Sequence, residues 1–194
     1  FAPTAAVLHG AAVESWLVSM QLPPSAEYEH GHTIEVRLTS HASGDLLVVD
    51  RSGNVTRMDP TLRSARWTFS SGDLSGFLSP AILAGGYAIV SSLDGPLRAL
   101  DVETGSVAWS LPDMPCVSAP VVCDRRVACA TVDGRLHAID ADSRKVVSTA
   151  LPAPCSDDLV SWSGAIFCVD AQGTATSWTA DLELRWTRSL DDVA

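Results

Sequence analysis

Short runs of apolar residues recur along the chain and are separated by polar turns. Between residues 33 and 38, Ile34, Val36 and Leu38 alternate with polar side chains. A period of two is typical of a strand with one buried face. No ten-residue segment from 33 to 190 shows a convincing helical period. Four apolar runs follow the same plan, at residues 46–49, 87–90, 127–130 and 165–168.

A repeat becomes visible at the glycine that follows each apolar run. These anchor glycines are 42, 39 and 39 residues apart, and they are Gly53, Gly95, Gly134 and Gly173. A large apolar residue stands five residues after each anchor: Met58, Leu100, Ile139 and Trp178. In three copies an aspartate comes next: Asp59, Asp101 and Asp140. Internal repetition at this period indicates a repeat architecture.

A tryptophan closes most copies of the repeat. Trp67 and Trp109 stand fourteen residues after their anchors, and Trp186 stands thirteen residues after its own. The third copy has Ser148 at the fourteenth position and has lost the tryptophan. The pattern is therefore strongest in the second copy and weakest in the third.

Turn signals divide each repeat into four short strands. Asp94 and Gly95, like Asp133 and Gly134, form Asp-Gly pairs that favour a tight hairpin because the turn needs positive φ. Four strands in about 40 residues, repeated, are the signature of a β-propeller blade. We predict an all-β fold with four four-stranded antiparallel blades, at residues 33–70, 76–112, 115–151 and 155–190.

One segment of the second copy resembles a known family. Ala99, Asp101, Thr104, Gly105 and Trp109 match the tryptophan-docking motif of the PQQ-like, or quinoprotein-type, β-propeller repeat. The other copies keep parts of that motif: Asp59 and Trp67 in the first, Ala138 and Asp140 in the third, and Trp186 in the fourth.

The resemblance implies that the motif tryptophans dock between neighbouring blades. A tryptophan buries a large apolar face, and its N–H needs a partner, which a capped turn one blade away can supply as a carbonyl. Trp67, Trp109 and Trp186 are therefore predicted to be blade-docking residues, together with the turn residues Ala99, Asp101, Thr104, Gly105, Asp59 and Asp140. Ligand stacking is the alternative role for these tryptophans.

Four blades are fewer than the seven or eight with which this family usually closes. The chain is therefore expected to form part of a larger propeller, because a half-propeller exposes blade edges and apolar faces. Residues 1–32 are expected to form an N-terminal segment that supplies an outer strand of a preceding blade, and 191–194 a tail. Trp16 and Trp178 are expected to contact a partner.

Charge and missing motifs exclude several classes of function. Thirteen basic and 23 acidic residues give a net charge of −10, which disfavours nucleic acid and anionic membrane as partners. Quinone-dependent relatives use adjacent cysteines and a calcium site, and this chain has no adjacent cysteines and a single asparagine. We predict no catalytic, cofactor-binding or metal-binding residue, no cofactor and no membrane insertion.

The weaker chemical signals have ordinary explanations. Glu27, Glu29, His30 and His32, with His41, could hold a metal, but a polar surface loop is the simpler interpretation. Asn54 begins a glycosylation sequon. The five cysteines are expected to be free thiols in the cytoplasm or another reducing compartment, with Cys123 partly exposed. Equivalent cysteines of neighbouring blades should lie too far apart for a disulfide.

Three functions remain open from the sequence. The first is a non-catalytic interaction or scaffolding module whose partners are other protein chains or the rest of a parent propeller. The second is a fragment of a quinone- or metal-dependent oxidoreductase. The third is a peptide-binding sensor that adds a client strand to an open blade edge.

Overall fold

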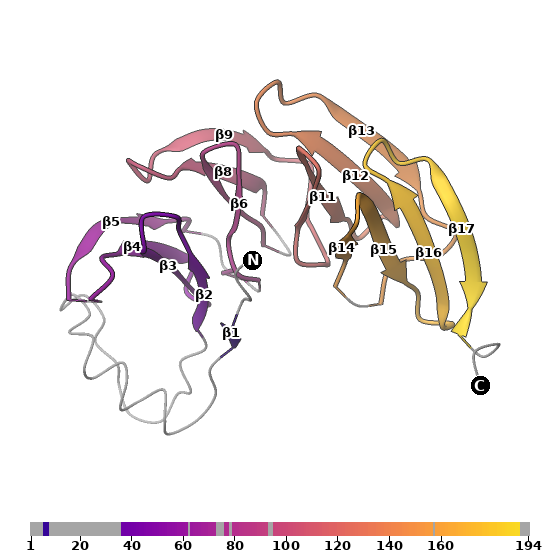
Figure 1. Ribbon diagram of the computed structural model, residues 1–194, viewed down its shortest axis with the longest axis horizontal. Coiled ribbons are helices and arrows are strands. Elements are labelled where there is room, and N and C mark those ends of the chain that lie inside the picture. The colour runs from indigo at the N-terminus through magenta and orange to yellow at the C-terminus, as the bar shows by residue number, and fades with distance from the viewer. Residues whose placement is uncertain are drawn as a thin grey trace.

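The computed structural model describes residues 6–7, 36–61, 63–72, 76–77, 79–92, 95–156 and 158–190. Strands follow one another as antiparallel neighbours in four separate sheets, and the described residues contain no α-helix. The prediction of an all-β protein with four propeller-like blades is therefore confirmed. In Figure 1 the blades form an arc, with the chain running from the indigo blade to the yellow one.

Each sheet is one blade, and its strands keep chain order. Blade 1 contains β2 (Val36–Ser40), β3 (Leu46–Asp50), β4 (Asn54–Met58) and β5 (Ala65–Ser70), and β1 (Ala6–Val7) pairs with β2. Blade 2 contains β6 (Ile82–Ala84), β7 (Tyr87–Val90), β8 (Leu97–Asp101) and β9 (Val107–Leu111). Blade 3 contains β10 (Val121–Cys123), β11 (Arg126–Ala130), β12 (Arg135–Asp140) and β13 (Val146–Ala150). Blade 4 contains β14 (Val160–Trp162), β15 (Ala165–Val169), β16 (Thr174–Thr179) and β17 (Leu184–Ser189).

The first strands of the blades form the inner rim of the arc. β10 contacts both β6 and β14, the first strands of the blades on either side. The fourth strands, β5, β9, β13 and β17, lie on the outside (Figure 1). Tryptophans on the outer strands therefore sit far from the rim.

The core is divided among the gaps between blades. Side chains alternate between the two faces of a strand, so the middle strands of each blade are apolar on both faces. One cluster joins blades 1 and 2 around Val55 and Leu100, a second joins blades 2 and 3 around Ile89 and Ile139, and a third joins blades 3 and 4 around Ile166. We name these gaps the first, second and third interfaces.

The cysteines differ from the prediction of five free thiols. Cys155 and Cys168 form a disulfide with their Cα atoms 5.9 Å apart, and Cys123 is buried rather than partly exposed. Equivalent cysteines of neighbouring blades are too far apart to bond, whereas these two lie in one blade. Cys155 forms an isolated antiparallel bridge with Asp170, which brings it beside β15.

Candidate protein-interaction site

Trp67 reaches across the first interface. Its indole Nε1 donates a hydrogen bond to the carbonyl of Val102 in blade 2, at 3.0 Å. The ring lies on the turn that follows Asp101, because a Cβ added to Gly105 would come within 2.5 Å of the ring atom Cδ2. Gly105 also has a φ of +73°. Glycine is thus required here both by the backbone conformation and by the ring above it.

Trp109 repeats this arrangement at the second interface. Its Nε1 donates to the carbonyl of Ala141 in blade 3, at 3.1 Å, and only 6% of the residue is exposed. The Tyr87 ring meets it edge-on, with centroids 6.4 Å apart. In both interfaces the acceptor is the residue directly after the turn aspartate.

The turn aspartates hold the acceptor loops in shape. Asp101 Oδ1 accepts hydrogen bonds from the backbone N–H of Glu103 and Thr104 and from the Thr104 hydroxyl. The bond from the Thr104 backbone, followed by that from its hydroxyl, lowers the pKa of Asp101. Asp140 is capped in the same way by Ser143, first through its backbone, and its pKa is also lowered.

Asp59 caps the corresponding turn of blade 1. Its carboxylate accepts from the hydroxyls of Ser64 and Thr61, and these bonds lower its pKa, Ser64 contributing most. The backbone N–H of Thr61 adds a further bond at 2.8 Å. The four turns therefore differ in sequence, but in three of them an aspartate at the same position caps its own turn.

A bulge in the outer strand positions the tryptophan. Trp67 lies opposite Arg57 and Trp109 opposite Ala99, and in each blade the register shifts by one residue just before that pair. Trp186 lies opposite Ser177 after a similar shift. An extra residue in one strand reverses which face the following side chains take, so the bulge turns the tryptophan toward the next blade.

Blade 3 has no such bulge. Val147 there lies opposite Ala138, in regular register, and therefore occupies the tryptophan position. Val147 is half-buried against the third interface, whereas Ser148 points to the other face and bonds to His137 Nδ1 at 2.7 Å. Blade 3 thus has valine at the docking position. Counting fourteen residues from the anchor, which gives Ser148, misses this position by one residue.

Trp186 occupies the docking position of blade 4, but no described blade lies in front of it. Its early place in the sequence arises because the turn between β16 and β17 is one residue shorter, closed by Thr179 N–H to Glu183 O. It contacts Phe167, with ring centroids 6.0 Å apart, and the Arg188 guanidinium lies 5.6 Å above it. Trp186 remains 37% exposed, and its Nε1 has no hydrogen bond to any described residue.

The surface around Trp186 exposes large apolar side chains that no other described residue covers. Val160 pairs with Phe167, Phe167 with Ser177, and Ser177 with Trp186, so these four share one face of blade 4. The matching row of blade 2, from Ile82 to Trp109, packs into the second interface. In blade 4 Val160 is 57% exposed and Trp162 74%. We call this surface the open face.

The two predicted partner-contact residues have different outcomes. Trp16 lies outside the described residues. Trp178 is only 4% exposed, packs in the third interface and donates from Nε1 to Thr176 Oγ1 at 2.9 Å, so it offers no surface to a partner. The reason is its position: Met58, Leu100 and Ile139, which stand at the same place after their anchors, are buried too.

A buried ionic cluster at the first interface is absent from the sequence predictions. Asp45, 1% exposed, accepts from Arg57 Nε at 2.7 Å and from Arg66 Nε at 2.6 Å. Arg57 also donates to the Val102 carbonyl, at 2.7 Å, and pairs with Glu103. The Arg66 bond, and then that of Arg57, lowers the pKa of Asp45 against the opposing effect of burial. The available signal was Arg57 itself, which stands where the other copies have Ala99, Ala138 and Ser177.

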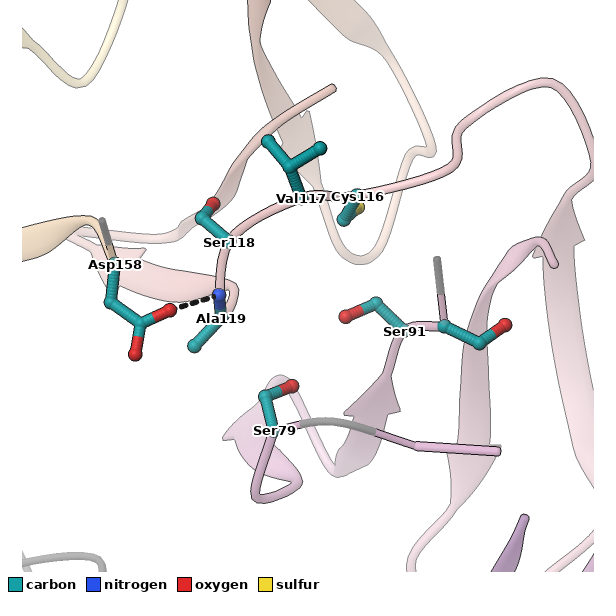
Figure 2. A pocket seen from close by; sticks show the side chains of 8 residues that line it. Ser79, Ser91, Cys116, Val117, Ser118, Ala119 and Asp158 are labelled. Carbon is teal, nitrogen blue, oxygen red and sulfur yellow. Dashed lines mark hydrogen bonds between the residues drawn. The ribbon is translucent and has the colours of Figure 1, made fainter. Parts of the chain in front are cut away.

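A small pocket lies between the inner ends of blades 2, 3 and 4. It has about 50 Å³ of free space, enough for a few water molecules and far below the size of a typical cofactor site. Figure 2 shows the Ser79 and Ser91 hydroxyls pointing into it, and Asp158 Oδ1 accepting from the Ala119 N–H at 2.7 Å. Ser79 Oγ is buried without a hydrogen-bond partner among the described residues.

The remaining sequence candidates add no site. The proposed metal loop, residues 27–32, lies outside the described residues, and His41 bonds through Nδ1 to Ser43 Oγ. Among the residues described, no three His, Cys, Asp or Glu side chains are grouped closely enough to hold a metal. Asn54 donates from Nδ2 to Asp50 at 2.9 Å. No described segment forms a helix with the length and apolar character needed to cross a bilayer.

Comparison with known proteins connects these blades to one repeat type. The family model described as outer membrane protein assembly factor BamB matches residues 14–119 and 51–193. No curated protein matches the chain.

Solved structures resemble it in fold. BamB from Moraxella catarrhalis is 16% identical, with a TM-score of 0.55 over 81% of this chain and 61% of its own. BBS1N, solved in complex with ARL6DN, is 16% identical, with a TM-score of 0.64 over 87% of this chain and 56% of its own. The designed protein Ika4 is 13% identical, with a TM-score of 0.61 over 78% of this chain and 95% of its own. This chain thus spans about three fifths of BamB and nearly all of Ika4.

Proposed function

Because this chain belongs to the PQQ-like β-propeller family of outer membrane protein assembly factor BamB, we propose that it is a non-catalytic interaction module whose open face receives a further propeller blade. The observation that carries the proposal is Trp186. It stands where Trp67 and Trp109 stand in their blades, and both of those donate to the blade in front.

The chemistry of the open face defines its occupant. At the first interface Arg57 and Trp67 donate together to the carbonyl of Val102. On the open face Ser177 replaces Arg57, is 1% exposed, and has a hydroxyl without a hydrogen-bond partner among the described residues. The occupant is therefore a blade of the same repeat type, which presents a capped turn with a backbone carbonyl to Trp186 Nε1, as Val102 and Ala141 do for Trp67 and Trp109.

The size of the relatives supports a larger assembly. The chain covers 61% of BamB and 56% of BBS1N, so both of those proteins extend beyond the matched blades. The BBS1N structure is a complex with ARL6DN, which supports protein contact as the mode of action. Exposed apolar surface of this kind is usually covered in the native assembly.

A matched pair of variants tests the open face. Val160→Glu places a charge on it, whereas Val132→Glu changes an equally exposed valine in a turn; the two residues are 57% and 58% exposed. In sedimentation velocity over a concentration series, the wild-type chain and Val132→Glu should self-associate, because the open face of one copy binds a second copy. Val160→Glu should stay monomeric.

The opposite results would refute the proposal. If the wild-type chain remains monomeric at every concentration, the open face does not bind another blade. Association that is equal in all three proteins would place the contact elsewhere. Both outcomes concern the face and leave the blade fold itself unaffected, which circular dichroism of the same samples monitors.

A further inference from the structure

Blade 3 has two cysteines at the positions that the disulfide occupies in blade 4. Cys116 and Cys129 precede Cys155 and Cys168 by 39 residues each, the repeat period of these two blades. Both pairs are consequently 13 residues apart. The two blades thus have cysteines at the same two positions of the repeat.

The backbone around the two pairs is also equivalent. Each first cysteine forms an isolated antiparallel bridge, Cys116 with Thr131 and Cys155 with Asp170. The next residue then donates its N–H to the second strand of the blade, at 2.9 Å in both cases: Val117 to Ala130 and Ser156 to Val169. The backbone that allows the Cys155–Cys168 bond therefore exists in blade 3 as well.

The two thiols of blade 3 are buried in the same apolar cluster at the second interface. Cys129 is fully buried, and its pKa is raised well above the ordinary value, first by a hydrogen bond with the Cys116 thiol and then by burial. Cys116 also donates to the carbonyl of Met114, at 3.5 Å. A buried site that disfavours the thiolate tolerates a disulfide, which carries no charge.

We propose that Cys116 and Cys129 form a second disulfide, equivalent in blade 3 to Cys155–Cys168 in blade 4. The oxidant is a small disulfide compound of the glutathione type. Both thiols are buried in the folded protein, so the oxidant reaches them while the chain folds.

The exchange proceeds in two balanced steps. The Cys116 thiolate attacks one sulfur of the oxidant, which forms a mixed disulfide and releases one thiolate. Cys129 then attacks the Cys116 sulfur as the thiolate, before burial in the completed fold raises its pKa, and the second thiolate is released. The protein loses two thiol protons and two electrons, the protons pass to the departing thiolates, and the oxidant becomes two thiols.

The bond would fix one wall of the pocket. Cys116 begins a segment that continues through Val117, Ser118 and Ala119, all of which line that pocket. Cys129 lies in β11 and packs in the second interface. Oxidation would therefore join the pocket wall to the core between blades 2 and 3.

Peptide mapping of the full chain provides the test. The protein is reduced, refolded with reduced and oxidised glutathione, denatured, and alkylated before trypsin digestion. Cleavage at Arg98, Arg125, Arg126 and Arg135 puts Cys116 in peptide 99–125 and Cys129 in peptide 127–135. We expect these peptides to be linked through Cys116, with one alkylated cysteine in the chain, Cys123.

Two variants distinguish this bond from alternatives. Cys129→Ser should leave Cys116 alkylated, and Cys123→Ser should leave the two peptides linked while the alkylated cysteine disappears from peptide 99–125. Three alkylated cysteines beside an intact Cys155–Cys168 bond would overturn the proposal, as would a link through Cys123. If Cys129→Ser does not fold, the wild-type map and Cys123→Ser still decide the question.

Discussion

The first and third interfaces of the propeller use different chemistry to join one blade to the next. At the first interface Arg57 and Trp67 cross the gap to a single carbonyl, that of Val102, and Asp45 neutralises Arg57 from behind. At the third interface Val147 takes the tryptophan position, and the buried contacts around Ile166 are apolar. An ion pair between Arg126 and Asp181 joins these blades, but Asp181 is 67% exposed.

This difference shows that the repeat requires a filled gap rather than a particular side chain. Apolar burial is nondirectional, so a valine can replace a tryptophan if the neighbouring residues close around it. A buried arginine, in contrast, is stable only with its partners in place. The first interface should therefore be the more specific in its pairing and the more sensitive to single substitutions.

The largest expected effect is at the second interface, where Trp109 is 6% exposed and donates to the Ala141 carbonyl. Trp109→Ala should lower the free energy of unfolding by roughly 3–5 kcal/mol, the usual cost of removing a buried aromatic ring. Urea denaturation measures this. Trp162→Ala is the control, because Trp162 is 74% exposed and its loss should change stability by less than about 0.5 kcal/mol. Equal effects of the two changes would contradict a docking role for Trp109.

Asp45→Asn should produce the next largest loss. It removes the carboxylate that balances Arg57, which is 4% exposed. Removing one member of a buried pair costs roughly 3–5 kcal/mol in general, and the remaining bonds of Arg57 to Val102 and Glu103 should reduce this to about 2–3 kcal/mol. Glu103→Gln, at a 67% exposed side chain, should cost less than about 1 kcal/mol. A neutral Asp45→Asn would show that the cluster does not hold the interface.

The same cluster should make the protein sensitive to acid. The folded-state pKa of Asp45 is lowered, so its contribution to stability is complete above the unfolded-state pKa of about 4 and is lost as the pH falls toward the folded-state value. Asp101 and Asp140 act in the same direction. The free energy of unfolding should thus decline below about pH 4. Asp45→Asn should show a shallower decline, and an identical slope would exclude Asp45 as a cause.

Gly105→Ala should cost roughly 1–3 kcal/mol, because alanine is strained at a φ of +73° and its Cβ would meet the Trp67 ring. The change can be separated into its two causes with Trp67→Ala. In that background only the backbone strain remains, so Gly105→Ala should cost less there. A cost that is independent of Trp67 would mean that the ring does not press on this turn.

The smallest effect is expected at the third interface. Val147→Ala removes part of a half-buried side chain and should cost roughly 0.5–1.5 kcal/mol. Thermal or urea unfolding of Val147→Ala beside Trp109→Ala compares the two modes directly. If Val147→Ala lowered the free energy of unfolding more than Trp109→Ala does, the third interface would depend on this one side chain and not on apolar burial shared among many.

The fold was predictable because its signals are local and repeated. Apolar runs, the Asp-Gly turns and the motif around Trp109 each lie within a few residues, so they appear in the sequence without knowledge of strand pairing. The contacts that sequence analysis missed depend on register. Asp45 meets Arg57 only through the pairing of β3 with β4, and Val147 occupies its place only because β13 lacks a bulge.

The cysteines and Trp178 show the same limit. Cys155 and Cys168 meet through a bridge within one blade, which a comparison between neighbouring blades does not consider. Trp178 was expected on a partner surface because it lies in the last repeat, but its position after the anchor faces the third interface. The reducing compartment stays an untested prediction, and its argument from five free thiols no longer holds.

The bulge in the outer strands has a consequence for how such repeats diverge. Deletion of the one unpaired residue near the start of the outer strand, Ala108 in blade 2, converts a bulged strand into a regular one, as the strand pairings of blades 2 and 3 illustrate. The deletion changes which side chain faces the next blade, yet leaves the three inner strands untouched. An alignment of these repeats therefore needs a one-residue gap at this point. With that gap, Val147 and not Ser148 is the counterpart of Trp109, and degenerate blades that have lost their tryptophan become recognisable as members of the array.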